Sequence, residues 1–514
     1  MNDAYVLLTG ATGFIGHHVL YEFLRRGRPC AVTLRRPIEP QVARLARLLM
    51  PLGLDVHTAI KAGRLVPISF DLLDDAPPDP PVGISSVLHA AASTRFEPDG
   101  SGEPTRTNVE GTRRLLAWAH ARGVRDFHFV SSAFACGRVP RSTEARFGYP
   151  QPPFHNAYER SKWEAEQLVH DAASHARHPA TIYRPSIVVG SSVTGRASKF
   201  DGFYVTVRAT ELLARAYAGR SRAERHRIPL RIKGRPGDGQ NIVPVDYVAS
   251  MIAAIFTDPS LHGRTYHLVN PHPPTNALIK TALEKHFDIA GGTFVEPQRF
   301  ACSALNETES LFHDVSRPVE HYFVDSPHFD RWRTAEVERV VGITCPRYDV
   351  PSLRQLFAAA IECGWGKARG ASKPRRTIAV DGDEECPVYF ERFLPTRIPL
   401  SRVARMTAMD VKIRFIIDDQ PEGDWLCAFE RGQLKHVTRG ATQLGCDFGY
   451  RADLQSFWRA ISGTAHPQEF FLRGRADVFG DVARGLKMAM ILNAFSREHP
   501  CDRQTLLELR RRAC

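Results

Sequence analysis

The sequence lacks several features that would place the protein in a membrane or outside the cell. It has no run of about 18 uninterrupted apolar residues, so no segment is long enough to cross a bilayer as a helix. The start, Met1 to Ala4, is acidic where a secretory signal would be basic. The ten cysteines contain no CxxC pair and no clustered Cys/His spacing, and therefore give neither a disulfide framework nor a zinc site. We expect a cytoplasmic protein with no membrane span and no metal.

The charge balance is basic. The 68 Lys+Arg residues against 56 Asp+Glu leave a net charge of +12, which would suit nucleic acid, anionic lipid, or an acidic cofactor or substrate. An arginine-rich solvated surface would give the same excess. The sequence carries no nucleic-acid-binding motif. We therefore expect some of the basic residues to bind phosphate-bearing ligands and the rest to lie on an ordinary solvated surface.

The length calls for at least two domains. A chain of 514 residues exceeds the roughly 250–300 residues at which single cores stop growing. The hydrophobic share of 43% and the charged share of 24% are close to globular averages, so both domains should have ordinary cores. We place the first domain at 1–365, a linker short of apolar residues and rich in Gly, Lys and Arg at 366–376, and the second domain at 377–514.

The first domain alternates short apolar runs with amphipathic stretches. This β-α-β rhythm is typical of an α/β fold in which helices cover a parallel sheet. Six segments read as its buried strands: 5–8, 31–34, 66–68, 86–88, 127–130 and 181–183.

The second domain has a different pattern. Apolar and charged residues alternate over 411–417, and a turn leads to another strand at 425–429, which predicts an antiparallel sheet with one buried face. A helix should run from about Val482 to Phe495 with Asp481 as its cap. Its apolar stripe, read as Leu486, Ala489, Met490 and Asn493, is more typical of plain core than of a ligand site. The whole is an α+β domain.

A glycine-rich turn directly follows the first strand and opens a helix. Gly10 permits a tight turn, Gly13 lets the backbone approach a pyrophosphate, and Gly16 lets the helix pack closely on the strand. The start of the helix would present free N–H groups to that anion. The predicted dinucleotide-binding residues of this turn are Gly10, Thr12, Gly13, Phe14, Ile15 and Gly16.

The second strand ends in two arginines. An NAD-preferring site would place Asp or Glu there, whereas Arg35 and Arg36 suit a 2′-phosphate, so we predict NADP(H) as the cofactor. Asp71 and Leu72, after the third strand, are placed for an adenine contact.

Three residues form a candidate catalytic set. Ser132 ends the strand at 127–130, and Tyr158 and Lys162 stand four residues apart, which puts them on one helical face. A tyrosine with a pKa of about 10 needs an adjacent ammonium to exchange a proton with a carbonyl oxygen near neutrality. Tyr158 would donate this proton, Lys162 would stabilise the phenolate and hold the nicotinamide ribose, and Ser132 would orient the oxygen.

With these motifs, the first 365 residues resemble an extended short-chain dehydrogenase/reductase, which implies a Rossmann fold with a substrate-binding part. The resemblance rests also on the segments 89–92, 108–112 and 184–190. It implies that Ser132, Tyr158 and Lys162 are catalytic and that Asn108 supports the active-site water. It also implies that Ala90, Ala91, Pro185 and Ile187 lie at the cofactor.

Two later segments, 190–202 and 241–248, resemble the thioester-reductase and fatty-acyl-reductase branch. The resemblance implies an NADPH-dependent reductase of acyl thioesters, with CoA or a carrier protein as the acyl donor. It leaves open the substrate, an aldehyde or alcohol product, and the oligomeric state, although a homodimer is common in the family.

Residues 377–500 resemble a sterol-carrier-protein domain through the segments 447–450, 457–458, 462–471 and 480–492. This resemblance implies an apolar tunnel for lipids or acyl chains. The domain would either hold the apolar part of the substrate or serve as a packed scaffold.

Two other functions stay open. A sugar-nucleotide epimerase or dehydratase would use the same residues with a retained cofactor, although such chemistry commonly runs on NAD. A non-catalytic, NADP-bound scaffold could instead carry lipid to a partner.

Overall fold

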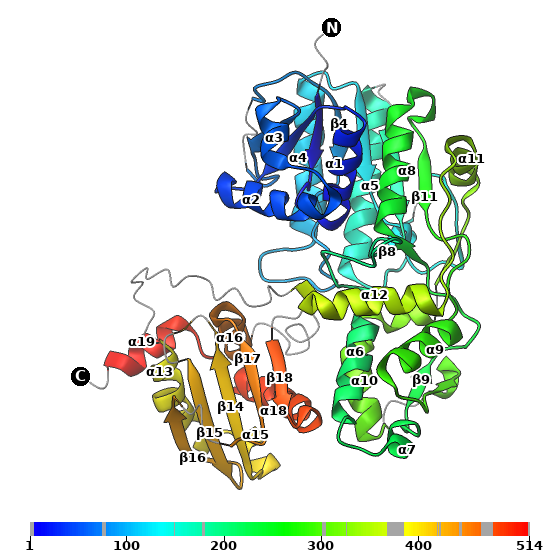
Figure 1. The fold of residues 1–514 in the computed structure, drawn as a ribbon. Helices are drawn as coiled ribbons and strands as arrows, with labels where there is room; N and C mark the ends of the chain where they lie inside the picture. Colours follow the sequence, from blue (N-terminus) through cyan, green and yellow to red (C-terminus); the bar gives the residue numbers. More distant parts are fainter. Residues whose placement is uncertain are drawn as a thin grey trace.

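The computed structural model describes residues 5–74, 79–148, 150–176, 180–300, 305–324, 326–366, 385–418, 420, 423–440, 445–463 and 476–511 (Figure 1). The predicted linker lies outside the described residues apart from Gly366, and so does 464–471 of the sterol-carrier-like segments. The domain boundaries therefore stay predictions.

A parallel sheet forms the centre of the first domain, as predicted, but it has seven strands: β11, at one edge, was not among the six predicted. The strands lie in the order β11-β7-β5-β4-β1-β2-β3. From β1 the chain builds the sheet first toward β3 and then, starting at β4, toward β11, and ligands of open α/β sheets bind at such a switch point. The strands are β1 (Tyr5–Thr9), β2 (Cys30–Leu34), β3 (Leu65–Ser69), β4 (Ile84–His89), β5 (Asp126–Val130), β7 (Ala180–Pro185) and β11 (Thr265–Leu268).

Helices cover both faces of this sheet because alternate strand residues point to opposite sides. Val6 and Leu8 pack with α1 (Phe14–Arg25), α2 (Ile38–Leu49), α3 (Val56–Lys61) and α8 (Val245–Thr257) in one apolar cluster. Leu7 packs with α4 (Gly111–Ala121) and α5 (Ala157–Ala176) in another. The buried strands are therefore apolar on both faces.

A small lobe follows the sheet and holds three short parallel strand pairs. These pairs are β8 (Ile187–Val189) with β10 (Ile242–Pro244), β9 (Arg231–Lys233) with β12 (Thr293–Val295), and β6 (Arg141–Ser142) with β13 (His328–Phe329). The helices of this part are α6 (Phe203–Ala216), α7 (Arg222–Arg225), α9 (Asn276–Phe287), α10 (Glu307–Ser316) and α12 (Val350–Glu362), whereas α11 (Trp332–Val341) packs on the seven-stranded sheet against β11 and α8. A 3₁₀ segment, Arg317–Phe323, returns the chain toward α5.

The second domain is a five-stranded sheet with helices, in the order β16-β15-β14-β17-β18. The predicted hairpin is present, but the prediction of an antiparallel sheet is wrong in one pairing, since β14 and β17 run parallel. The strands are β14 (Val411–Ile417), β15 (Asp424–Glu430), β16 (Gln433–Arg439), β17 (Phe448–Ala452) and β18 (Ala476–Gly480). The helices are α13 (Glu385–Val388), α14 (Leu394–Arg397), α15 (Arg402–Thr407), α16 (Leu454–Ile461), α18 (Val482–Glu498) and α19 (Arg503–Arg511).

Helix α18 begins as predicted and faces the core differently. Asp481 caps it by accepting a hydrogen bond from the Arg484 amide at 3.0 Å. Of the predicted stripe, Ala489 and Asn493 are buried, whereas Met490 is 36% exposed and Met488, outside the predicted stripe, is buried. The stripe is therefore rotated from the predicted one.

The two domains share a packed interface. Helix α18 contacts α6 and α10, and one apolar cluster contains residues of both domains, including Leu212 and Val482. The guanidinium of Arg215 donates to the carbonyl of Val478 at 3.0 Å, and that of Arg208 lies 3.3 Å from the Asp477 carboxylate. The second domain is thus docked on the small lobe. None of the described helices is long and apolar enough to cross a membrane.

Candidate active site

The turn between β1 and α1 has the geometry of a phosphate cradle. Gly10 has a φ of +74°, and a Cβ there would lie 2.6 Å from the Ala91 nitrogen. A Cβ on Gly16 would lie 2.1 Å from the Gly10 carbonyl oxygen, so only glycine allows the helix to approach the turn this closely. The first-turn amides of Phe14 and Ile15 have no intrahelical acceptors, as at any helix start, and no side chain at Gly13 caps them. Together with Thr12 in the turn, these residues fit a dinucleotide pyrophosphate.

Arg35 and Arg36 lie exposed directly after β2, beside this turn. Arg36 donates from Nε to the Ser69 hydroxyl at 3.0 Å, and neither arginine pairs with a carboxylate among the residues that the structure describes. Both guanidiniums can therefore accept an anion.

The remaining predicted cofactor residues lie at the same end of the sheet. The Asp71 carboxylate accepts from the Leu73 amide at 3.0 Å, and Leu72 is buried. The amides of Ala90 and Ala91 bond to Thr9, the last residue of β1. Pro185 ends β7 and Ile187 begins β8. These positions fit the predicted contacts, which stay predictions.

The structure brings Ser132, Tyr158 and Lys162 together. Ser132 follows β5 and its hydroxyl is hydrogen-bonded to the Tyr158 phenol. The Lys162 ammonium donates to the Val130 carbonyl at 2.7 Å and lies 4.3 Å from the centre of the Phe129 ring. It is only 2% exposed.

Burial shifts the pKa of both titratable residues of the catalytic set, Tyr158 and Lys162. It raises the pKa of Tyr158 to about 12, against a smaller lowering by the hydrogen bond from Ser132. Burial also lowers the pKa of Lys162 to about 7, although the charge of Glu166 one turn further along α5 opposes the change. A phenol with this pKa holds its proton at neutral pH and can donate it when an adjacent positive charge stabilises the phenolate.

Asn108 lies in a π-helical turn, Arg106–Glu110, and joins two parts of the site. Its amide nitrogen donates to the Ser93 carbonyl and the Ser161 hydroxyl, both at 2.8 Å, while its oxygen accepts from the Ser93 amide at 2.8 Å. Asn108 therefore fixes the loop after β4 against α5, and its predicted role at a water is untested.

A buried chain of hydrogen bonds joins β1 to two segments that carried the family resemblance, 89–92 and 108–112, although the sequence did not predict these bonds. His89 contacts the Thr9 hydroxyl at 2.7 Å and the Thr112 hydroxyl at 3.0 Å, and Thr112 donates to the Asn108 carbonyl at 2.6 Å. Burial, assisted by the charge of Lys162, lowers the pKa of His89 to about 3, so it stays neutral. The chain links the phosphate-binding turn to the catalytic set.

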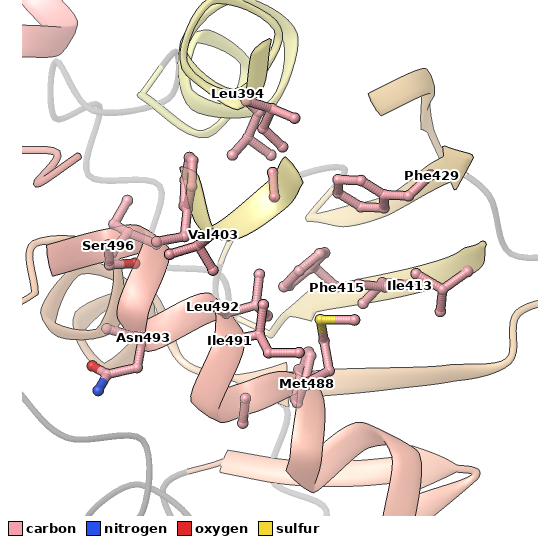
Figure 2. A pocket seen from close by; sticks show the side chains of 18 of the residues that line it. Leu394, Val403, Ile413, Phe415, Phe429, Met488, Ile491, Leu492, Asn493 and Ser496 are labelled. Carbon is pink, nitrogen blue, oxygen red and sulfur yellow. The ribbon is translucent and has the colours of Figure 1, made fainter. Parts of the chain in front are cut away.

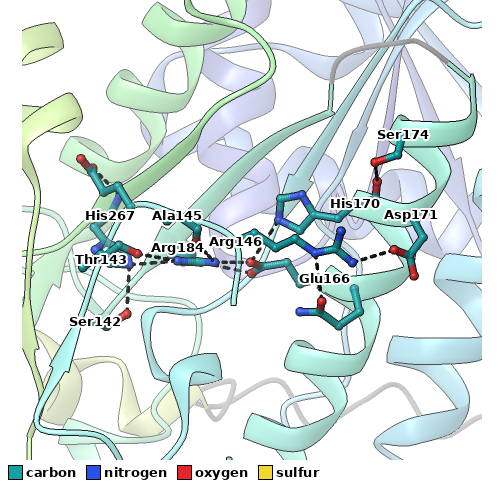
Figure 3. A network of polar contacts seen from close by, with 12 residues as sticks. Ser142, Thr143, Ala145, Arg146, Glu166, His170, Asp171, Ser174, Arg184 and His267 are labelled. Atoms are coloured by element: carbon teal, nitrogen blue, oxygen red, sulfur yellow. Dashed lines mark hydrogen bonds and ion pairs between the residues drawn. The ribbon is translucent and has the colours of Figure 1, made fainter. Parts of the chain in front are cut away.

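Arg184 is the centre of a second network, which sequence reasoning placed only within a motif (Figure 3). Its guanidinium donates to Glu166 at 3.2 Å and to the carbonyls of Thr143 and Ala145 at 2.9 and 2.8 Å. Although burial opposes ionisation, the Arg184 charge lowers the pKa of Glu166 to about 2. The network holds α5, and with it Lys162, against β7 and the loop after β6.

Two aromatic residues beside Tyr158 were missed. The Phe96 ring lies 6.4 Å from that of Tyr158 and 6.1 Å from that of Tyr322. The Tyr322 hydroxyl donates to Glu159 at 3.0 Å. No local sequence signal marks Tyr322, because it reaches the site only through the fold.

The second domain contains an apolar cavity of about 150 Å³ between its sheet and α18. Phe415 of β14, Val403 of α15, and Met488 and Leu492 of α18 surround one space (Figure 2). An apolar cavity of this size can accept apolar ligands.

Comparison with known proteins gives one family match. Residues 8–252 match the family described as "Male sterility protein". Among curated proteins, the aldehyde reductase lnaA of Aspergillus flavus is 28% identical over 378 residues, which cover 69% of this chain and 34% of that protein. The glycine betaine reductase ATRR of Emericella nidulans is 27% identical over 290 residues, covering 52% and 21%. The chain thus spans about a third or less of the length of these relatives.

Solved structures share the fold of the first domain. The terminal R domain from the myxalamid PKS-NRPS biosynthetic pathway superimposes with a TM-score of 0.55 at 24% identity, covering 71% of this chain and 92% of that one. The reductase domain of a nonribosomal peptide synthetase from Mycobacterium tuberculosis gives a TM-score of 0.52 at 19% identity, with 70% and 92% covered. The first domain therefore has the Rossmann-type fold of these reductase domains.

Proposed function

We propose that this chain, whose residues 8–252 match the male sterility protein family, is an NADPH-dependent reductase of a carbonyl or acyl thioester on an apolar substrate. The observation that carries the proposal is the position of Ser132, the half-buried Tyr158 and the buried Lys162 at the carboxyl end of the parallel sheet, next to a glycine cradle. The lnaA and ATRR relatives, which are named as reductases, support it.

In this mechanism the residues of the chain hold the reacting oxygen and supply its proton. Ser132 donates a hydrogen bond to the carbonyl oxygen and orients it toward Tyr158, and the Tyr158 hydroxyl gives up its proton to that oxygen. The Lys162 ammonium stabilises the phenolate that remains. Bound NADPH supplies the hydride for the carbon. Phe96 and Tyr322 form an aromatic wall beside Tyr158.

The test of the reaction is loss of the phenol. Tyr158→Phe should lower kcat for NADPH oxidation with acyl-CoA, carrier-bound thioester or aldehyde substrates by about 10²–10⁴-fold, the usual size of general acid catalysis. Tyr217→Phe is the matched control, because this tyrosine bonds Thr308 in the small lobe at 2.8 Å. Unchanged turnover in Tyr158→Phe would falsify the proposal.

The NADP preference rests on Arg35 and Arg36. A charge-assisted hydrogen bond is worth about 1.5–3 kcal/mol, so Arg35→Ala should raise the KM for NADPH about 10–100-fold and leave that for NADH nearly unchanged. Arg35 is the cleaner position, because Arg36 also bonds Ser69. Equal effects on the two cofactors would refute the preference.

The second domain would hold the apolar part of the substrate, such as an acyl chain, in the cavity lined by Met488 and Leu492. Mass spectrometry of small molecules that co-purify with the full chain should identify both a cofactor and a lipid. A dry, ligand-free cavity with unchanged activity in Leu492→Trp would favour a packed scaffold instead. Turnover without net NADPH oxidation would favour an epimerase-type reaction.

A further inference from the structure

The 3₁₀ segment Arg317–Phe323 connects the small lobe to the catalytic residues. On the lobe side, the Glu320 carboxylate lies 2.8 Å from Nδ1 of His313 in α10. The Phe323 carbonyl accepts a hydrogen bond from the side-chain amide of Asn276 in α9 at 2.9 Å. Two helices of the lobe therefore hold this segment, and its remaining contacts are those through which the lobe meets the site.

Tyr322 makes the contact on the catalytic side, first through its hydroxyl. The hydroxyl donates to the Glu159 carboxylate at 3.0 Å, and Glu159 directly follows Tyr158 in the first turn of α5. The other oxygen of Glu159 accepts from the His155 amide at 3.0 Å. Because Glu159 is only 1% exposed, these bonds replace the water that its carboxylate has lost. Removing the Tyr322 hydroxyl would therefore weaken the hold on the turn that carries Tyr158.

The ring of Tyr322 makes a second contact, on the side of Ser132. It lies edge-on to Phe134 with 4.7 Å between the ring centres, and such aromatic pairs stabilise a fold beyond the area that they bury. The Phe134 amide donates to the Ser132 hydroxyl at 3.2 Å. One side chain from the small lobe thus contacts both the residue next to Tyr158 and the residue that bonds Ser132.

We infer that Tyr322 is a positioning residue, through which the small lobe fixes the Tyr158 phenol and the Ser132 hydroxyl relative to the substrate oxygen. The inference rests on the proposed reductase function, in which Tyr158 donates the proton. Accurate placement matters, because a shift of about 1 Å in an active site can cost about 10²-fold in rate. A substrate that lies against the small lobe is then aligned with its proton donor by the same segment.

Tyr322→Phe tests the hydroxyl contact, because it keeps the ring and removes the bond to Glu159. We expect kcat for NADPH oxidation to fall about 10- to 100-fold, while the dissociation constant for NADPH in a fluorescence titration stays unchanged. Tyr266→Phe is the matched control, since this buried tyrosine of β11 also loses one hydrogen bond, to the Leu261 carbonyl at 2.7 Å, and should keep the wild-type kcat. Urea unfolding of each variant verifies that it is folded under the assay conditions.

Three comparisons separate positioning from a general loss of stability. Glu159→Leu removes the partner of the same bond, so adding Tyr322→Phe to it should cause no further loss of kcat. In single-turnover assays with excess enzyme, Tyr322→Phe should also leave the residual rate of Tyr158→Phe unchanged, because the hydroxyl acts through Tyr158. Tyr322→Leu removes the ring contact with Phe134 as well, and should lower kcat below that of Tyr322→Phe.

Wild-type kcat in Tyr322→Phe overturns the inference, and so does an equal fractional loss of rate with and without the Tyr158 phenol. Either result leaves the reductase proposal standing, because the Tyr158→Phe assay decides that proposal by itself.

Discussion

Replacing Lys162 with methionine should stabilise the folded chain while abolishing its activity. The lysine is 2% exposed, and burial lowers its pKa from 10.5 to about 7. Each pKa unit is worth about 1.4 kcal/mol, so holding the charged lysine in the fold costs about 5 kcal/mol below pH 7. The methionine variant escapes this cost but also loses the hydrogen bond to the Val130 carbonyl, which lowers its stability by about 2 kcal/mol. We expect Lys162→Met to raise the free energy of unfolding by about 3 kcal/mol at pH 6.

The sign of the pH dependence follows from proton counting. Between pH 7 and 10.5 the unfolded chain retains the proton that folded Lys162 has lost, so the wild-type chain gains stability as the pH rises through this window. Below pH 7 both states carry the proton and the folded state bears the full cost. The advantage of Lys162→Met should therefore shrink by about 3 kcal/mol between pH 6 and pH 9.5.

Urea unfolding or calorimetry of both chains across this range measures the effect, and comparison at each pH cancels the titrating groups that do not interact with Lys162. Lys61→Met is the matched control, because Lys61 is exposed on α3 and should show no such trend. A destabilised Lys162→Met at pH 6, or a difference that does not change with pH, would refute the reasoning.

Three further substitutions probe other parts of the structure. Gly16→Ala should weaken NADPH binding at least tenfold in a fluorescence titration, because its Cβ would lie 2.1 Å from the Gly10 oxygen; unchanged affinity would contradict the close approach. Arg184→Met should lower the free energy of unfolding by about 3–5 kcal/mol in urea, since it removes the cation and leaves the buried Glu166 unpaired, and a loss below 1 kcal/mol would argue against that pair. Asp477→Asn should cost about 1 kcal/mol, because the Arg208 guanidinium keeps Glu211 as a partner; calorimetry showing no change would mean that the interface does not depend on this pair.

Local features of the first domain could be predicted from the sequence. The six predicted strands, the turn at Gly10 and the single helical turn between Tyr158 and Lys162 depend on residues close together in the chain, and the structure confirms them. Tyr322 could not be found in this way, because its place beside Phe96 depends on the return of a distant segment.

The second domain shows the same limit. The hairpin of β14 and β15 is local and was predicted, whereas the parallel pairing of β14 with β17 joins strands that are not adjacent in sequence. Helix α18 was predicted with its cap, but its rotation was not, because the choice between Met488 and Met490 as the buried residue depends on the sheet it packs against.

The docked interface has a practical consequence for dissecting the chain. Arg215 satisfies the backbone carbonyl of Val478, and Val482 is buried in a cluster that includes Leu212 of the other domain. A fragment beginning at residue 377 would expose this apolar surface and a strand edge to water, which favours self-association. Lipid transfer measured on such a fragment would then report an aggregate, so the function of the second domain is better measured in the full chain.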